Sequence, residues 1–247
     1  MELAIDTSSN TTSIALSEGG CLMASLTWQT SRNHTVELLP NLICLLQQFG
    51  VELGSMEAII VARGPGSFNG LRVGVSTAKG LAFALNIPLV GIDTSEAEAY
   101  DFAFTGLPLR PIYKAGREQV ATALYRQIGD EWQHLEEPNL STLTDLWPRI
   151  KEKTLFCGEI PSGMMKEIQR TLGKQAIVSH SISPCRSTAL AVLGWRKLTR
   201  GERDDPITLQ PLYLRPPHIT KPRDKRPPFA TVSKSSETKN GNSQTRC

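Results

Sequence analysis

The stretch AIIVARGPGSFNGLRVGVSTAKGLA, residues 58–82, decides the fold class of this chain. It begins with an apolar run, Ala58–Ala62, continues through a glycine-rich turn, and ends in a segment that favours a helix. In α/β proteins, a buried strand followed by such a turn and a helix commonly presents backbone N–H groups to an anion or a partner. The stretch therefore predicts an α/β protein.

The chemistry of the turn itself leaves three roles open. It is not a Walker A loop, because no Gly-Lys-Ser/Thr closes it, and it is not a dinucleotide fingerprint, because Asn69 stands at the third glycine position. Glycine mainly supplies backbone angles that other residues cannot reach. A phosphate cradle, a tight structural turn and an interface loop all remain compatible with the sequence.

The composition is that of an ordinary soluble globular protein, with 40% hydrophobic and 21% charged residues among 247. No apolar run approaches the roughly 20 residues of a membrane-spanning helix. The first residues lack a secretory signal, so we expect a cytoplasmic protein without membrane contact. The 5 cysteines never form a CxxC pair, which argues against a disulfide framework and a zinc site.

Turn residues and apolar patterns divide the chain into two modules and a tail. The first module, 1–104, is expected to form a mixed sheet, with strands at 3–6, 13–17, 22–28, 58–62 and 88–92 and helices at 33–49 and 71–85. The second module, 105–217, is expected to contain strands at 111–115, 120–126, 155–157 and 176–178 and helices at 161–172 and 187–199.

The tail, residues 218–247, carries the net positive charge: it holds 7 Lys or Arg against 2 acids, whereas the rest of the chain holds 20 basic and 22 acidic side chains. Lys, Pro, Ser and Thr dominate it, and it has too few large apolar side chains to offset the entropy of ordering, so we expect it to be disordered. Its cluster of Lys221, Arg223, Lys225 and Arg226 suits phosphate contacts without sequence preference. A solvated extension is the more ordinary interpretation, and we favour it.

Several motifs together resemble a known family. The hairpin of Ala4–Ser8 and Ser13–Leu16 resembles that of the actin/Hsp70/sugar-kinase superfamily. The motif His34-x-x-Glu37-Leu38-Leu39-Pro40, the run Gly64–Lys79 and the motif Pro211-x-Tyr213-Leu214-Arg215 resemble bacterial TsaB-type (YeaZ-type) proteins. The resemblance covers about residues 1–216 and implies an actin-like (ASKHA, RNase H-like) α/β fold: duplicated modules, each a mixed sheet flanked by helices.

The resemblance also implies a function. TsaB-type proteins are partner subunits in the synthesis of threonylcarbamoyladenosine beside the anticodon of tRNA. The expected partners are a TsaD-type catalytic subunit and a TsaE-type ATPase, with tRNA reached through the complex and no cofactor on this chain. A homodimer through the N-terminal module is also compatible with the sequence. The rival interpretation is a free-standing actin-fold small-molecule kinase or a glycoprotease-like peptidase.

Three residues depart from the family pattern. Asn69 stands where family members usually carry Thr, which is a mild polar exchange. Lys114 and Gln119 replace two acids that are usual in the second module. Whatever a carboxylate pair does there in relatives, this chain does differently or not at all.

Asp6, Thr7 and Ser8 are the candidates for a nucleotide site. By resemblance, Asp6 occupies the place that ATP-using superfamily members use for magnesium and phosphate. Alternatively, the three residues close a turn through local side-chain hydrogen bonds. We favour the local turn, because neither a second phosphate loop nor a catalytic carboxylate can be placed in the second module.

The sequence predicts neither a metal centre nor a catalytic residue. Thr94 and Glu98 fall where the catalytic relatives carry the two histidines of an H-x-x-x-H motif, and Thr with a lone Glu makes a poor transition-metal site. Ser67 is not in a Gly-x-Ser-x-Gly elbow, because Asn69 stands two residues after it. A binding subunit is the remaining interpretation.

The first helix supports a docking role. Its apolar residues span about 180°, whereas a helix packed only on its own sheet shows an apolar face nearer 100°. An enclosed core helix would show the same wide arc. We expect Leu39, Ile43 and Leu46 to face inward, and the second helix to offer its small residues to a partner helix. The predicted partner-binding residues are His34, Leu38, Leu42, Leu45, Gly74 and Ala78.

Overall fold

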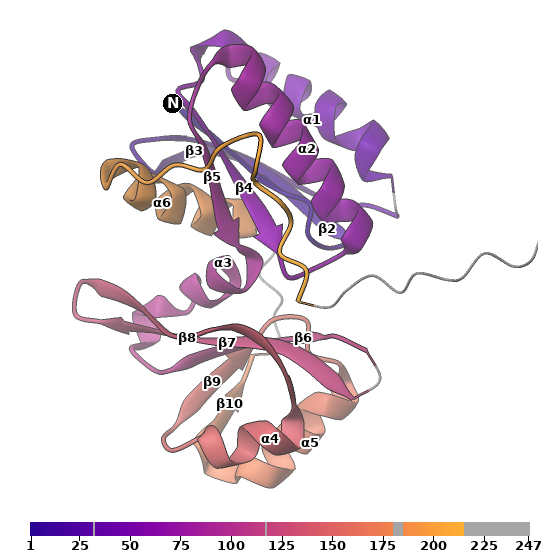
Figure 1. Cartoon of the computed structure of the whole chain (residues 1–247), viewed down its shortest axis with the longest axis vertical. Coiled ribbons are helices and arrows are strands. Elements are labelled where there is room, and N and C mark those ends of the chain that lie inside the picture. The colour runs from indigo at the N-terminus through magenta and orange to yellow at the C-terminus, as the bar shows by residue number, and fades with distance from the viewer. Residues whose placement is uncertain (32, 117, 180–184, 215–247) are drawn as a thin grey trace, which may run out of the picture. The chain divides into compact units, whose positions relative to one another are not determined.

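The structure, a computed structural model, describes residues 1–31, 33–116, 118–179 and 185–214 (Figure 1). The predicted tail, 218–247, and Arg215 of the last family motif lie outside these residues. The prediction of a disordered tail therefore stays a prediction.

The first sheet has the strand order β3-β2-β1-β4-β5. Its central strand β1 pairs antiparallel with β2 and parallel with β4, so that Ile5 lies between Ile14 and Val61. Every residue of β1 is buried, as expected for a strand covered on both faces. The strands are β1 (Glu2–Asp6), β2 (Thr11–Glu18), β3 (Cys21–Gln29), β4 (Ala58–Gly64) and β5 (Leu89–Asp93).

The second sheet repeats this order as β8-β7-β6-β9-β10. Its β6 pairs antiparallel with β7 and parallel with β9, as β1 does with β2 and β4. This repetition confirms the prediction of duplicated mixed-sheet modules. The strands are β6 (Leu109–Lys114), β7 (Gln119–Ile128), β8 (Glu131–Thr142), β9 (Thr154–Cys157) and β10 (Ala176–Val178).

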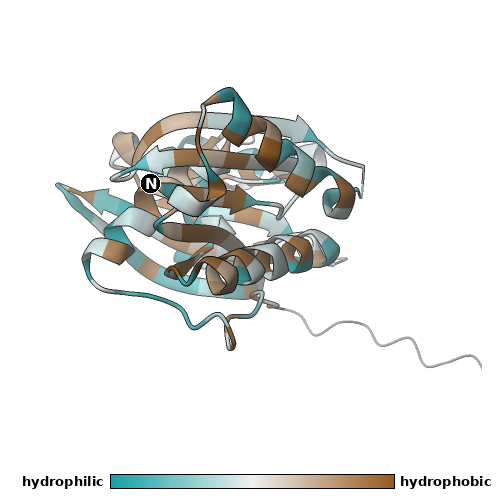
Figure 2. Ribbon diagram, turned by 90° about the horizontal axis from the view of Figure 1, so that it is seen from above, coloured by the Kyte–Doolittle hydropathy of each residue, from teal (hydrophilic) through white to brown (hydrophobic). Residues whose placement is uncertain are grey.

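Helices cover both faces of the first sheet. On β1, Leu3 and Ile5 face the core under α1 and α2, whereas Ala4 faces the core under α6, because successive side chains of a strand point to opposite faces. Figure 2 shows the apolar residues along the strands between these helices. The α-helices are α1 (His34–Gln48), α2 (Phe68–Leu85), α3 (Thr94–Tyr100), α4 (Leu143–Leu146), α5 (Ser162–Leu172) and α6 (Arg186–Thr199). Single 3-10 turns lie at Leu53–Ser55, Ala103–Thr105, Trp147–Arg149 and Gly173–Gln175.

The end of the second predicted module belongs to the first sheet. Helix α6 packs against β1 and β2, and a Cβ on Gly194 would lie 2.5 Å from the side chain of Ile60, so this glycine allows close contact. Farther along, the backbone N–H of Leu212 donates to the carbonyl oxygen of Arg63 over 2.6 Å. The assignment of residues 186–214 to the second module is therefore wrong. An apolar helix pattern gives no signal of which sheet it covers.

Among the strands and α-helices, β8, α3 and the short α4 were not predicted. Strand β8 (sequence EWQHLEEPNLST) is an edge strand of largely half-buried or exposed residues, and Pro138 within it disfavours a strand prediction. Helix α3 has seven residues, nearly all buried, and its sequence TSEAEAY lacks an apolar stripe. Every strand and helix that was predicted is present, with ends shifted by a few residues.

Candidate functional site

Gly66, in the turn after β4, and Gly70, in the first turn of α2, allow α2 to lie directly against the turn that joins β1 to β2, residues 7–10. A Cβ on Gly66 would lie 2.3 Å from the carbonyl oxygen of Ser8, and one on Gly70 would lie 2.1 Å from that of Thr7. Real Cβ atoms do not approach backbone atoms so closely. Close packing therefore accounts for these two glycines.

Hydrogen bonds join the same two segments. The backbone N–H of Ser67 donates to the carbonyl oxygen of Ser8 over 2.6 Å. The Thr7 hydroxyl donates to the carbonyl oxygen of Gly70 over 2.8 Å, and the Ser67 side chain accepts from the N–H of Gly70, which caps α2. The start of α2 is thus fixed to the 7–10 turn.

Helix α1 begins at the same turn. The ring atom Nε2 of His34 lies 2.9 Å from the carbonyl oxygen of Ser9, and the His34 side chain is buried. The 7–10 turn therefore holds the first residues of both α1 and α2.

Asp6, at the end of β1, has both carboxylate oxygens occupied. One oxygen accepts from the backbone N–H of Ser8 over 2.8 Å and also from its hydroxyl group. The other accepts from Nε of Arg186, the first residue of α6, over 2.7 Å. The local turn favoured from the sequence is thus present between Asp6 and Ser8, whereas Thr7 bonds to α2 instead.

Arg186 is the centre of a buried polar cluster. Its Nη1 donates to Glu98 over 3.1 Å, and its Nη2 donates to the hydroxyl groups of Ser9 over 2.7 Å and Ser8 over 3.3 Å. Arg186 and Asp6 are each 1% exposed and Glu98 is 0% exposed. Burial lowers the pKa of Arg186, but the carboxylates of Asp6 and Glu98 outweigh it and raise the pKa above its usual value. We call Asp6, Ser8, Ser9, Glu98 and Arg186 the Arg186 cluster.

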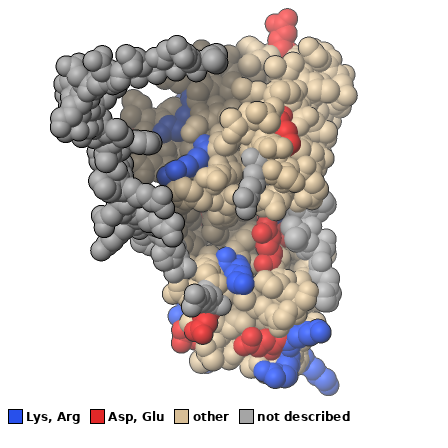
Figure 3. Space-filling view, turned by 90° about the vertical axis from the view of Figure 1, so that its right-hand side faces the viewer, with Lys and Arg blue, Asp and Glu red and all other residues tan. Residues whose placement is uncertain are grey.

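A cleft of about 650 Å³ opens above this cluster. Figure 3 shows the hollowed face of the molecule, with Lys and Arg side chains set in the hollow. Among the described lining residues, Lys114 and Glu159 carry charges. The lining comes from the 7–10 turn, the start of α2, the end of β6 and the end of the described chain, and includes Ser8, Ser9, Asn10, Ser67, Tyr113 and Leu214.

The positions expected for metal-binding histidines lie on α3. Thr94 and Glu98 are both buried one helical turn apart; the Thr94 hydroxyl accepts from the N–H of Gly64 over 3.1 Å, and Glu98 bonds to Arg186. Within the described part of the chain, no three His, Cys, Asp or Glu side chains gather in a way that could hold a metal ion. No helix there is long and apolar enough to cross a membrane.

The expected orientation of α1 is wrong. Leu38, Leu42 and Leu45 are 1%, 1% and 2% exposed and pack in the core, whereas Val36, Leu39 and Ile43 are 68%, 46% and 52% exposed. Of the residues expected inward, Leu46 is buried. The physical reason is His34: it is not a rim residue but an internal one, and its contact with Ser9 turns the side of α1 that carries Leu38, Leu42 and Leu45 toward the sheet.

The expected small-residue ridge of α2 also faces inward. A Cβ on Gly74 would lie 2.2 Å from the Thr7 hydroxyl oxygen, and Ala78 is fully buried.

On the side of α1 away from the core, Val36, Leu39 and Ile43 form what we call the outer stripe of α1. An apolar groove of about 300 Å³ runs beside it, lined by Leu39, Leu42, Ile43, Leu46, Gln47, Val51 and Leu53.

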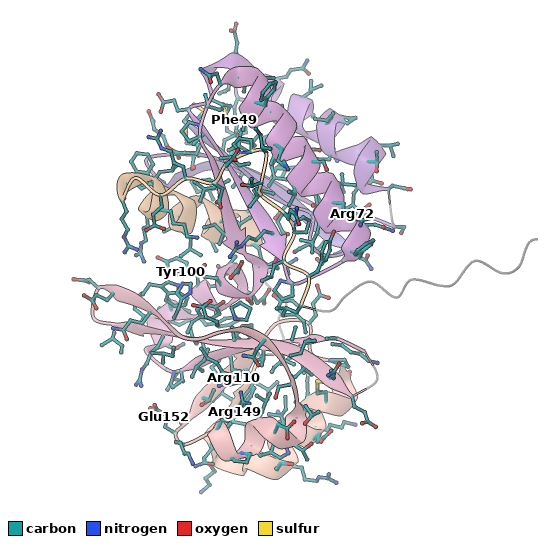
Figure 4. The ribbon with its side chains drawn as sticks, viewed as in Figure 1. Phe49, Arg72, Tyr100, Arg110, Arg149 and Glu152 are labelled. Carbon is teal, nitrogen blue, oxygen red and sulfur yellow. The ribbon has the colours of Figure 1, made fainter. Side chains whose placement is uncertain are left out.

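The end of the described chain crosses α2. Lys79 donates to the carbonyl oxygens of Ile207 and Leu209 over 3.1 and 3.0 Å. Arg72, labelled on α2 in Figure 4, lies 3.8 Å from the ring centre of Phe68 and donates to the Tyr213 hydroxyl over 3.1 Å. The family motifs at 64–79 and 211–214 are thus brought together in space.

Arg186 and Ser9 are site residues that the sequence did not single out, and Glu98 was considered only as a poor metal ligand. A lone arginine at the start of a helix gives no signal that its partner lies 180 residues earlier in the chain. Only the return of α6 to the first sheet brings it to Asp6.

Known proteins resemble this chain along most of its length. The profile of a family described as "TsaD: tRNA N6-adenosine threonylcarbamoyltransferase" matches residues 27–184. A Bacillus subtilis protein, "tRNA threonylcarbamoyladenosine biosynthesis protein TsaB", is 34% identical over 219 residues, which are 86% of this chain and 93% of that protein. The solved structure "YeaZ from Pseudomonas aeruginosa" is 25% identical, has a TM-score of 0.71, and covers 86% of this chain and 99% of that one.

The transferases match only in part. The "tRNA N6-adenosine threonylcarbamoyltransferase" of Syntrophus aciditrophicus is 47% identical over 62 residues, which are 25% of this chain and 18% of that protein. The Bacillus subtilis TsaB protein, in contrast to this transferase, matches nearly the full length of both its own chain and this one.

Proposed function

This chain belongs to the TsaB family of tRNA threonylcarbamoyladenosine biosynthesis proteins, and we propose on that premise that it docks and supports a TsaD-type catalytic subunit without performing the chemistry itself. The reaction of the complex is the modification of an adenosine beside the anticodon of tRNA. The tRNA reaches this chain through the complex.

The observation that carries the docking role is the outer stripe of α1. Three large aliphatic side chains are about half exposed or more on one helix, beside an apolar groove. Contiguous exposed apolar surface of this kind marks interaction sites. Helix α2 contacts α1 and adds Phe83, which is 79% exposed, so a partner presenting apolar helices would cover both.

The Arg186 cluster supports the non-catalytic role. The actin-like fold implies a magnesium–nucleotide site beside Asp6, but the residues present do not fit it. Both oxygens of Asp6 already accept hydrogen bonds, one of them from a buried guanidinium. A kinase that orients phosphate through magnesium needs that carboxylate free, so this observation disfavours the small-molecule kinase alternative.

The remaining partners follow from the same assignment. A TsaE-type ATPase joins the complex rather than this chain alone, and a second copy of this chain competes for the outer stripe of α1 with the catalytic subunit. The proposed compartment is the cytoplasm, where tRNA is modified.

The test compares three single variants, each with a glutamate at a different position of α1, and measures how well each captures the TsaD-type subunit of the same organism. Ile43→Glu charges the outer stripe and should leave the circular dichroism spectrum and melting temperature unchanged while removing capture, since central interface residues can each contribute about 2 kcal/mol or more. Gln48→Glu, also exposed but off the stripe, should bind normally.

Leu42→Glu completes the set, because it buries a charge and should unfold the protein. Normal capture by a folded Ile43→Glu would refute docking through this stripe. Equal loss of capture by Gln48→Glu would show that the effect is not specific to the stripe.

A further inference from the structure

The buried cluster beneath the cleft contains two carboxylates and one cation. Asp6 ends β1 and Glu98 lies on α3, and the guanidinium of Arg186 bonds to both. Carboxylates so fully removed from water are strongly destabilising unless they are paired. Arg186 is therefore needed for the charge balance of this buried cluster, which meets the cleft through Ser8 and Ser9.

Every nitrogen of the Arg186 guanidinium donates at least one hydrogen bond. Its three nitrogens donate to oxygen atoms of four residues: the carboxylates of Asp6 and Glu98 and the hydroxyl groups of Ser8 and Ser9. Carboxylate and hydroxyl oxygens are also ligands of hard divalent cations. The cluster is thus an oxygen-lined cation site in which the cation is a side chain.

We infer that Arg186 is the built-in cation of this fold, which takes the place of a divalent metal beside Asp6 and keeps metal out of the cleft. This inference goes beyond the proposed docking function and concerns the isolated chain. It predicts a latent metal site, because removal of the guanidinium leaves two buried carboxylates and two hydroxyl groups around a space that a small cation can enter.

The position of this cation matters for the rest of the protein. Both Ser8 and Ser9 bond to Arg186. The carbonyl oxygen of Ser8 also accepts from the N–H of Ser67 at the start of α2, and the carbonyl oxygen of Ser9 lies 2.9 Å from Nε2 of His34 at the start of α1. In a protein that binds a metal nucleotide, the ligand would hold the turn after the first strand. Here Arg186 holds the turn permanently, so the starts of α1 and α2 are set without a ligand.

The experiment uses the full chain and Mn²⁺ as the probe, with binding followed by electron paramagnetic resonance. We expect no stoichiometric Mn²⁺ binding by the unaltered protein. Arg186→Ala should melt roughly 10 °C lower, should bind one Mn²⁺, and should regain stability as the Mn²⁺ concentration rises. Added Mg²⁺ should displace the bound Mn²⁺.

Two further variants identify the site. Arg186→Ala combined with Asp6→Asn should lose the Mn²⁺ binding, because one of the two carboxylates is neutralised. Arg186→Lys should bind no Mn²⁺, because the ammonium keeps the positive charge in the cluster. If Arg186→Ala does not fold alone, refolding in Mn²⁺ gives the same readout.

Three outcomes would overturn the inference. One is Arg186→Ala that folds but binds no Mn²⁺. Another is Arg186→Ala that fails to refold in Mn²⁺, Mg²⁺ or Ca²⁺. The third is stoichiometric Mn²⁺ binding by the unaltered protein that Asp6→Asn removes, which would mean that Arg186 does not exclude metal. None of these readouts involves the catalytic subunit, so the docking proposal is tested separately.

Discussion

The ring of His34 lies 2.9 Å from the carbonyl oxygen of Ser9, so the first residue of α1 is joined to the turn that follows β1. A helix with apolar residues over half its circumference can pack on a sheet in more than one rotation. The contact between His34 and Ser9 selects the rotation in which Leu42 is buried and Ile43 is exposed.

Replacing His34 by alanine should weaken both the fold and the docking face. The change removes a buried hydrogen bond and leaves the Ser9 oxygen without that partner, at a cost of about 1–3 kcal/mol. We expect a lower denaturant midpoint and weaker capture of the catalytic subunit. Thr35→Ala, at the adjacent exposed position, is the control and should change neither. An unchanged midpoint for His34→Ala would mean that other contacts set the rotation of α1.

Truncation of single leucines on α1 should separate its two faces. Leu42→Ala removes a side chain from the core and should cost about 2–5 kcal/mol, whereas Leu39→Ala, nearly half exposed, should change stability by about 0.5 kcal/mol or less. Urea unfolding of both variants measures the difference. Similar losses for both would contradict the orientation of α1.

The sequence predicted the two-module fold because strand, turn and helix signals are local. The run Ala58–Ala62 and the glycines after it decide β4 and α2 without reference to the rest of the chain. The face of α1 could not be predicted, because the decisive contact joins His34 to a backbone oxygen 25 residues away. Arg186 was beyond sequence reasoning for the same reason, since long-range contacts leave no periodic pattern.

Alanine substitutions of two glycines in α2 should act in opposite directions. A Cβ on Gly70 would collide with the backbone oxygen of Thr7, so Gly70→Ala must displace the 7–10 turn or the start of α2. The substitution should lower the free energy of unfolding by several kcal/mol, as overpacking of a core does. Gly80 has open space, so Gly80→Ala should stabilise the protein by about 0.5–1 kcal/mol. Thermal melts of the pair test this directly, and a stable Gly70→Ala would contradict the close packing.

The pair of His134 and Glu96 should make stability depend on pH. His134 Nε2 lies 2.9 Å from Glu96, and this hydrogen bond raises the pKa of His134, although partial burial opposes the shift. A raised pKa in the folded state means that the contribution is fully present below the unfolded pKa of about 6.5 and is lost as the pH rises through the folded pKa.

In the variant His134→Gln, the free energy of unfolding should therefore depend less on pH above the unfolded pKa of His134. We expect the unaltered protein to lose more stability than the variant between pH 6 and pH 8.5 in urea titrations. Because Trp132 also donates to Glu96, the folded structure should persist in the variant. Parallel pH profiles for the two proteins would show that His134 does not titrate against Glu96.

The chain beyond Pro217 should be dispensable for stability, whereas the residues just before it should not. Leu212 donates its N–H to Arg63 of β4, and Tyr213 packs on Phe68 and accepts from Arg72, both of α2. These contacts hold the end of the described chain to β4 and α2. A protein ending at Pro217 should melt within error of the full chain. One ending at Gln210 loses all three contacts, each worth about 1 kcal/mol, and should melt several degrees lower. Two identical melting temperatures would mean that the contacts of Leu212 and Tyr213 contribute nothing measurable. If instead the protein ending at Pro217 melts several degrees below the full chain, the residues after Pro217 add stability, which their polar composition does not predict.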